Sequence, residues 1–133
     1  MLLILDWIFF GKVLAGIFIV AGITYIAYLN RSQLQEWIDS FVQNISVHAR
    51  KFWRLIVTRI TKKNVGKISK ITKQNQEELE ELLENDNNFV GLKLMYNTQT
   101  GKYTEEEAFY TRNVDSELER ATKNGQQIQV QLV

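Results

Sequence analysis

The first 29 residues carry the feature that most constrains this 133-residue chain, because nearly all of their side chains are apolar. The run from Val13 to Leu29 has no charged residue at any of its 17 positions. At about 1.5 Å per helical residue, it meets the length that spans roughly 30 Å of hydrocarbon if Lys12 snorkels to the interface. The sequence therefore predicts a single transmembrane anchor over residues 1–30.

Two alternatives compete with an uncleaved anchor: a secretory signal peptide and a buried helix of a water-soluble protein. The N-terminal residues MLLILD lack a basic side chain, and no small-x-small cleavage site follows the apolar run, which disfavours a signal peptide. Gly11, Ala15 and Gly22 share one face of the expected helix, and such spacing lets two membrane helices pack closely. A simpler interpretation is that small residues are common in membrane helices.

Residues 31–63 predict a long basic amphipathic helix. Apolar side chains recur at helical spacing from Leu34 to Ile56, although Arg59 interrupts the apolar stripe. The apolar face can bind an anionic lipid interface, a partner helix or the rest of its own domain, and pore formation is a lesser alternative. The candidate residues for contact with the membrane interface or anionic lipid are Trp37, Phe41, Arg50, Lys51, Phe52, Trp53, Arg54, Lys62 and Lys63.

Residues 64–88 predict a charged helical linker or a weak coiled coil, because two of the six seam positions are polar. Lysines at its start, together with Lys62 and Lys63, are able to contact nucleic-acid phosphates. No accompanying feature indicates base recognition, so nucleic acid is an unlikely partner. A solvated surface or contact with lipid headgroups is the favoured use of these lysines.

Residues 89–133 predict a small α+β module of a β-hairpin, a helix and a strand. Apolar side chains alternate from Val90 to Tyr96, and NTQTG supplies a turn before a return strand. Thr104 and Glu107 match a capping box that opens a helix, and Asn124 and Gly125 end it. The last residues, QQIQVQLV, alternate as a strand with one wet face. Because its core is small, this module is expected to dock on a protein partner or on its own copy.

Composition removes several classes of chemistry. The chain has no cysteine, which excludes disulfides, thiolate metal sites and cysteine nucleophiles. Its single histidine is His48. No catalytic, cofactor-binding or metal-binding pattern is recognisable, and the run Glu105–Glu107 is interpreted as the acidic first turn of a helix. The sequence predicts neither an enzyme nor a cofactor.

Together these patterns predict a mainly α membrane protein with a small C-terminal α+β module. Its expected function is that of a single-pass adaptor or assembly subunit, anchored in the plasma (inner) membrane with the C-terminal region in the cytoplasm. The expected partners are membrane lipids and a protein, or a second copy of the chain. The alternatives are a membrane-active effector, such as a small lysis or pore-forming protein, and a membrane tether for nucleic acid.

Overall fold

The computed structural model describes residues 4–9, 22–67, 73–123 and 126–132. These residues form six strands and three α-helices, with a short 3-10 turn on each side of β3. In chain order the elements are β1 (Ile4–Phe9), β2 (Ile23–Tyr25), α1 (Arg31–Val42), η2 (Arg50–Phe52), β3 (Trp53–Arg59), η3 (Val65–Lys67), α2 (Lys73–Leu83), β4 (Phe89–Asn97), β5 (Lys102–Thr111), α3 (Ser116–Ala121) and β6 (Gln126–Gln131).

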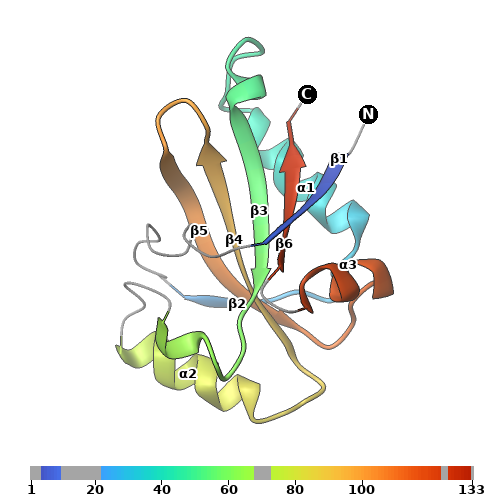
Figure 1. Ribbon diagram of the computed structural model, residues 1–133, viewed down its shortest axis with the longest axis vertical. Helices are drawn as coiled ribbons and strands as arrows, with labels where there is room; N and C mark the ends of the chain where they lie inside the picture. The colour runs from blue at the N-terminus through green and yellow to red at the C-terminus, as the bar shows by residue number, and fades with distance from the viewer. Residues whose placement is uncertain (1–3, 10–21, 68–72, 124–125, 133) are drawn as a thin grey trace.

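All six strands belong to one mixed sheet in the order β1-β6-β3-β4-β5-β2 (Figure 1). Strands β3, β4 and β5 follow one another as an antiparallel meander, and β6 pairs antiparallel with β3. At the two edges, β1 pairs antiparallel with β6, and β2 pairs parallel with β5. The centre of the sheet is therefore built from segments on both sides of α2 in the chain.

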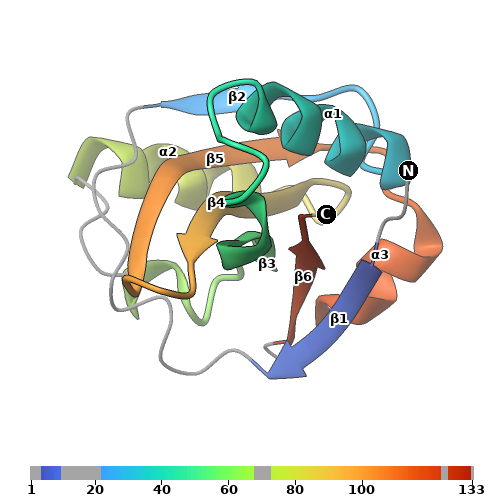
Figure 2. The same ribbon diagram turned by 90° about the horizontal axis from the view of Figure 1, so that it is seen from above.

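Helices cover both faces of the sheet because successive strand residues point to opposite sides. Leu55 and Val57 of β3 face a core that contains Leu34 of α1 and Leu118 of α3. Ile56 faces a second core that includes Leu79 of α2 and residues of β4. In Figure 2, α1 and α3 lie toward the right of the view and α2 toward the left.

The prediction of a transmembrane anchor is contradicted, because two apolar N-terminal segments form strands of the sheet. Ile4–Phe9 forms an edge strand on β6, and Ile23–Tyr25 forms another on β5. Across the described ranges, no helix has both the length and the apolar character needed to cross a bilayer. The mainly α, single-pass fold class and the assignment to the inner membrane are therefore wrong. Gly11 and Ala15 lie outside the described residues, and Gly22 is exposed beside β2.

The predicted amphipathic helix over residues 31–63 is also wrong beyond its first part. Helix α1 begins after Asn30, whose side-chain oxygen accepts a hydrogen bond from the Gln33 amide at 2.8 Å, and it ends at Val42. Residues Trp53–Arg59 form β3, and Leu55–Thr58 within it are buried without interruption. A strand covered on both faces is apolar at consecutive positions, and such a short run cannot be distinguished from a helix by periodicity.

The C-terminal prediction is confirmed for its strands and wrong for much of its helix. Strands β4 and β5 form the expected hairpin, and β6 is the expected last strand. The helix starts at Ser116 rather than Thr104, with Asp115 accepting the capping bond from the Glu117 amide, so the run Glu105–Glu107 lies in a strand. The expected wet face of β6 is buried, because Gln127 is 1% exposed and Gln129 is 8% exposed. Strand β6 lies between β1 and β3 and is not a sheet edge.

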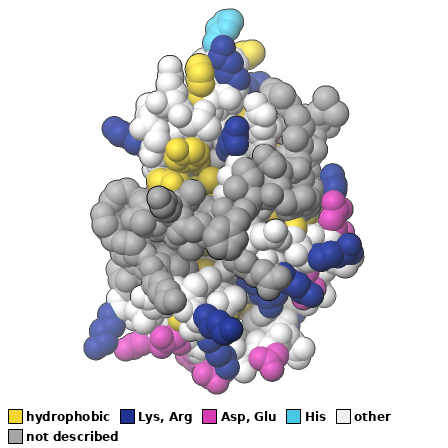
Figure 3. All heavy atoms as spheres, in the orientation of Figure 1, with side chains coloured by type: hydrophobic (Ala, Val, Ile, Leu, Met, Phe, Trp, Pro, Cys, Tyr) yellow, Lys and Arg dark blue, Asp and Glu magenta, His cyan; other side chains and the backbone are white. Residues whose placement is uncertain are grey.

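The segment 64–88 is helical from Lys73 to Leu83, as its composition indicates. Its apolar seam packs on the domain's own sheet through the buried Leu79, not in a coiled coil. Charged side chains of both signs gather at the end of the molecule where α2 lies (Figure 3). This end of the fold also holds the largest of the cavities described below.

Candidate anion-binding cleft

A cavity of about 680 Å³ opens where β3 ends, and three separate parts of the chain line it. The first part is the end of β3 with the following turn, residues 59–64. The second is the segment from the end of α2 to the start of β4, through Leu83 and Asn88. The third is the end of α3, through Thr122 and Lys123. We call this cavity the basic cleft because of the charges around it.

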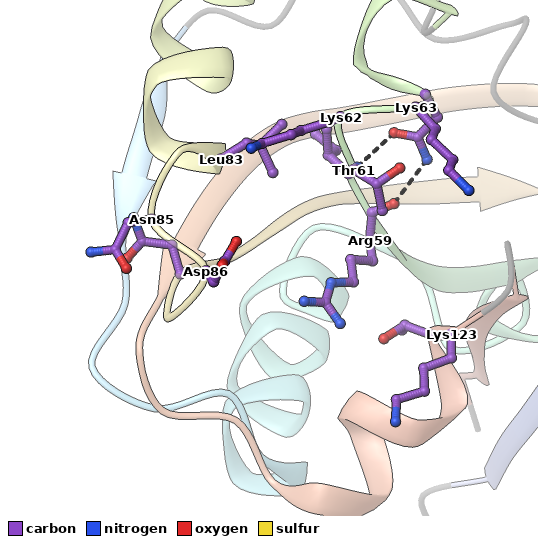
Figure 4. A pocket seen from close by; sticks show the side chains of 12 residues that line it. Arg59, Thr61, Lys62, Lys63, Leu83, Asn85, Asp86 and Lys123 are labelled. Carbon is purple, nitrogen blue, oxygen red and sulfur yellow. Dashed lines mark hydrogen bonds between the residues drawn. The ribbon is translucent and has the colours of Figure 1, made fainter.

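Four cationic side chains line the basic cleft against one acidic side chain. The cations are Arg59, Lys62, Lys63 and Lys123, and the acid is Asp86, so the lining carries four positive charges minus one, or +3. Figure 4 shows Arg59 and Lys123 facing the same open space from different elements. A concave site whose walls carry a net positive charge concentrates the electric field and attracts anions.

Arg59 is held in place by an aromatic ring. Its guanidinium carbon lies 5.0 Å from the centroid of the Phe89 ring, which is a cation–π contact. Phe89 is buried at the start of β4, so the ring itself is fixed by the core. The planar guanidinium is thereby oriented before any ligand binds, and less side-chain entropy is lost on binding.

The turn that carries Lys62 and Lys63 is closed by Asn64. Its side-chain oxygen accepts a hydrogen bond from the Thr61 amide at 2.7 Å, and its side-chain nitrogen donates to the Arg59 carbonyl at 3.2 Å (Figure 4). Both lysine side chains are exposed. The backbone of the turn is thus defined while its two ammonium groups remain accessible to a ligand.

The wall formed before β4 is fixed through Asn88. Its side-chain nitrogen donates to the Leu82 carbonyl at 2.9 Å, and its oxygen accepts from Nε of Arg112 at 3.5 Å. Lys62 approaches Glu84 at 4.0 Å, with both side chains largely exposed. An exposed ion pair of this kind contributes little stability, so Lys62 can exchange Glu84 for an anionic ligand.

The structure divides the residues that the sequence placed at a lipid interface. Lys62 and Lys63 line the basic cleft, whereas Arg50, Lys51 and Phe52 form η2 at the opposite end of β3. Strand β3 has seven residues, which separates the two groups by about 23 Å at roughly 3.3 Å per residue. The structure does not bring these predicted residues together as one surface.

Three of the four aromatic members of the same predicted set, Trp37, Phe41 and Trp53, are half-buried and pack against the core. Trp37 lies 5.3 Å from the ring of Phe109, and Phe41 lies 4.9 Å from the ring of Trp53. Arg54 donates a hydrogen bond to the side chain of Gln129 at 2.8 Å. These contacts account for the apolar stripe as a core-facing pattern. Lipid contact by any of these residues stays an untested prediction.

Sequence reasoning missed two of the four cationic members of the basic cleft, Arg59 and Lys123. The sequence contains a signal for Arg59, because a charged residue that interrupts an apolar stripe indicates either the end of a strand or a special environment. Lys123 left none, since it follows a short helix whose position relative to β3 depends on the whole sheet. The cleft is therefore a product of the tertiary structure.

Comparison of the chain with models of known families, with curated proteins and with solved structures finds no match. Among the residues that the structure describes, no group of three or more His, Cys, Asp or Glu side chains is arranged to hold a metal ion. The chemistry of the basic cleft follows from its own side chains, which offer positively charged hydrogen-bond donors to an anion.

Proposed function

We propose that this domain is a protein-interaction adaptor whose basic cleft binds a phosphorylated segment of a partner protein. The observation that carries the proposal is the placement of Arg59, Lys63 and Lys123, from two separate parts of the chain, around one cavity with a lining charge of +3. Charge-assisted hydrogen bonds from arginine and lysine to phosphate oxygens are about twice as strong as neutral ones.

A phosphate fits this charge balance better than a single carboxylate. A phosphorylated side chain carries a charge of about −1.5 to −2 at neutral pH and offers three strong acceptor oxygens. Arg59, oriented by the Phe89 ring, supplies a planar fork suited to two of those oxygens. Lys63 and Lys123 supply mobile ammonium groups for the remaining charge.

The cavity lining favours a protein ligand over single-stranded nucleic acid. Proteins that bind single strands combine a positive groove with aromatic rings on which the bases stack. The apolar side chains that line the basic cleft are Ile60 and Leu83, and none of its lining residues is aromatic. Ile60 is buried in the core, so the half-buried Leu83 is the aliphatic side chain available to contact an apolar residue that flanks a phosphorylated site.

The test is binding of the full chain to a degenerate phosphoserine peptide library and to the same library without phosphate, measured by fluorescence anisotropy. We expect Lys63→Ala and Lys123→Ala each to weaken phosphopeptide binding about tenfold, since a hydrogen bond to a charged group is worth about 1.5–3 kcal/mol. Lys102→Ala is the matched control, because Lys102 is an exposed lysine at the start of β5 and does not line the cleft.

Equal binding of the two libraries, or an equal loss in the Lys102→Ala control, would show that the cleft does not recognise phosphate. A single-stranded oligonucleotide serves as the competing probe at the same ionic strength. If it binds tightly, and Lys63→Ala and Lys123→Ala weaken it while phosphopeptides fail to bind, the ligand is nucleic acid and the adaptor proposal is wrong.

A further inference from the structure

A second cavity, of about 190 Å³, lies between α1 and the sheet and shares no lining residue with the basic cleft. Helix α1 contributes the rings of Trp37 and Phe41 to its walls, and the sheet contributes Leu55 and Met95. The side chains of Ser40 and the nearby Asn44 add polar groups. We call this space the α1 cavity.

Two opposite charges also line the α1 cavity. The Lys93 side chain is 18% exposed, and its ammonium lies 4.5 Å from the centroid of the Trp37 ring and 3.4 Å from a carboxylate oxygen of Glu107. Glu105 is exposed and has no ion pair or hydrogen bond to another described side chain. An ammonium has three donors, so Lys93 can keep Glu107 and bind a second acceptor.

Glu105 has a backbone conformation that ordinary residues rarely adopt. Its φ is +56°, and no other non-glycine residue among the described ones has a positive φ. It lies at a bulge, because Lys93 pairs with Glu107 while Met95 pairs with Thr104, which leaves two residues of β5 opposite one of β4. Such strain persists where the surrounding structure holds it in place, and bulges next to functional sites redirect a side chain.

We propose that the α1 cavity binds a small apolar α-amino acid as a free zwitterion. The ligand carboxylate binds the Lys93 ammonium, the ligand ammonium binds the Glu105 carboxylate, and the apolar side chain packs against Trp37 and Phe41. The strained bulge places the Glu105 carboxylate at the cavity that Lys93 also lines. This proposal does not depend on the basic cleft.

The cavity volume sets the size of the ligand. About 190 Å³ is below the roughly 300–1,000 Å³ of sites for drug-sized molecules. Valine and leucine are of this scale, whereas a nucleotide is too large.

The experiment titrates the full chain with L-valine and follows tryptophan fluorescence, with isothermal titration calorimetry as the second measurement. Two analogues separate the charges: 3-methylbutanoic acid lacks the ammonium, and 2-methylpropan-1-amine lacks the carboxylate. We expect each analogue to bind at least about tenfold more weakly than valine.

Glu105→Gln is the decisive variant, since its side chain is exposed and the change keeps its shape. It should weaken valine binding about tenfold and leave the weak binding of 3-methylbutanoic acid unchanged. Lys93→Met should weaken both ligands, and Glu78→Gln, at an exposed position of α2, should weaken neither. Equal melting temperatures of the parent and Glu105→Gln would show that the variant is folded.

Three results would overturn the proposal: no heat or fluorescence change with valine up to about 10 mM, equal binding of valine and its two analogues, or unchanged valine affinity in Glu105→Gln. Loss of phosphopeptide binding has no bearing on these outcomes, because Lys63 and Lys123 do not line the α1 cavity.

Discussion

Replacing Gly91 by alanine should destabilise the domain because a buried ring occupies the space of the new methyl group. An added Cβ would lie 2.5 Å from Cζ and 2.8 Å from Cε1 of Phe109, the residue that pairs with Gly91 across β4 and β5. The Phe109 ring is 1% exposed and is held by Trp37 at 5.3 Å and by Phe89 at 6.3 Å between ring centroids. The ring therefore has little freedom to move away.

The magnitude follows from two opposing terms. Forcing an additional methyl group into a packed core costs about 1–3 kcal/mol. Replacing glycine also restricts the unfolded chain, which offsets about 0.4–1 kcal/mol of this cost. We expect Gly91→Ala to lower the free energy of unfolding by about 1–2 kcal/mol, which for a chain of this length lowers the melting temperature by about 4–7 °C.

Urea unfolding followed by tryptophan fluorescence measures this change. Gly22→Ala is the matched control, because a Cβ at that position would meet no atom within 4 Å, and its free energy of unfolding should equal that of the parent or exceed it by up to about 1 kcal/mol. In a Phe109→Leu background, the cost of Gly91→Ala should fall by at least about half, since the two residues are in contact. Equal stability of the two alanine variants, or additive losses in the double variant, would refute the reasoning.

Two further predictions concern polar groups in or near the sheet. Gln127→Met should raise the free energy of unfolding by about 1–3 kcal/mol, because neither amide atom of buried Gln127 has a hydrogen-bond partner among the described residues. Gln129→Met should lower the free energy of unfolding, because it removes the hydrogen-bond acceptor of Arg54. The melting temperatures of the two variants should therefore shift in opposite directions. Burial raises the pKa of Tyr103, and the nearby Tyr96 raises it further. The folded state therefore resists ionisation of the Tyr103 hydroxyl, and the parent should lose stability as the pH rises above about 10 toward that raised pKa. Urea midpoints measured across this range should fall less steeply for Tyr103→Phe, and an identical slope would contradict the assignment.

Short-range patterns predicted the β4–β5 hairpin and the strand β6. Alternation from Val90 to Tyr96, followed by turn residues, indicated the β4–β5 hairpin, and alternation up to Leu132 indicated β6. A hairpin pairs residues that are close in the chain, so its sequence contains most of the information needed to form it. The expectation that one face of β6 is exposed to solvent was wrong, because alternation does not reveal what covers each face of a strand.

The basic cleft was predictable only in part. Lys62 and Lys63 belong to a run of basic residues that the sequence marks as a contact surface, while Arg59 appeared only as a flaw in an apolar stripe. Lys123 joins them because α3 packs beside β6, which pairs with β3. No local pattern contains the distance between residues 59 and 123.

By itself, the sequence determined where apolar residues concentrate and where the chain turns. The tertiary structure decided that Ile4–Phe9 and Trp53–Arg59 are strands, although both segments are apolar enough to suggest helices. A helix satisfies its backbone hydrogen bonds within itself, whereas a strand depends on partners that lie far along the chain. Both strands bond to β6, at the far end of the sequence, and their conformation is settled only when the whole sheet forms.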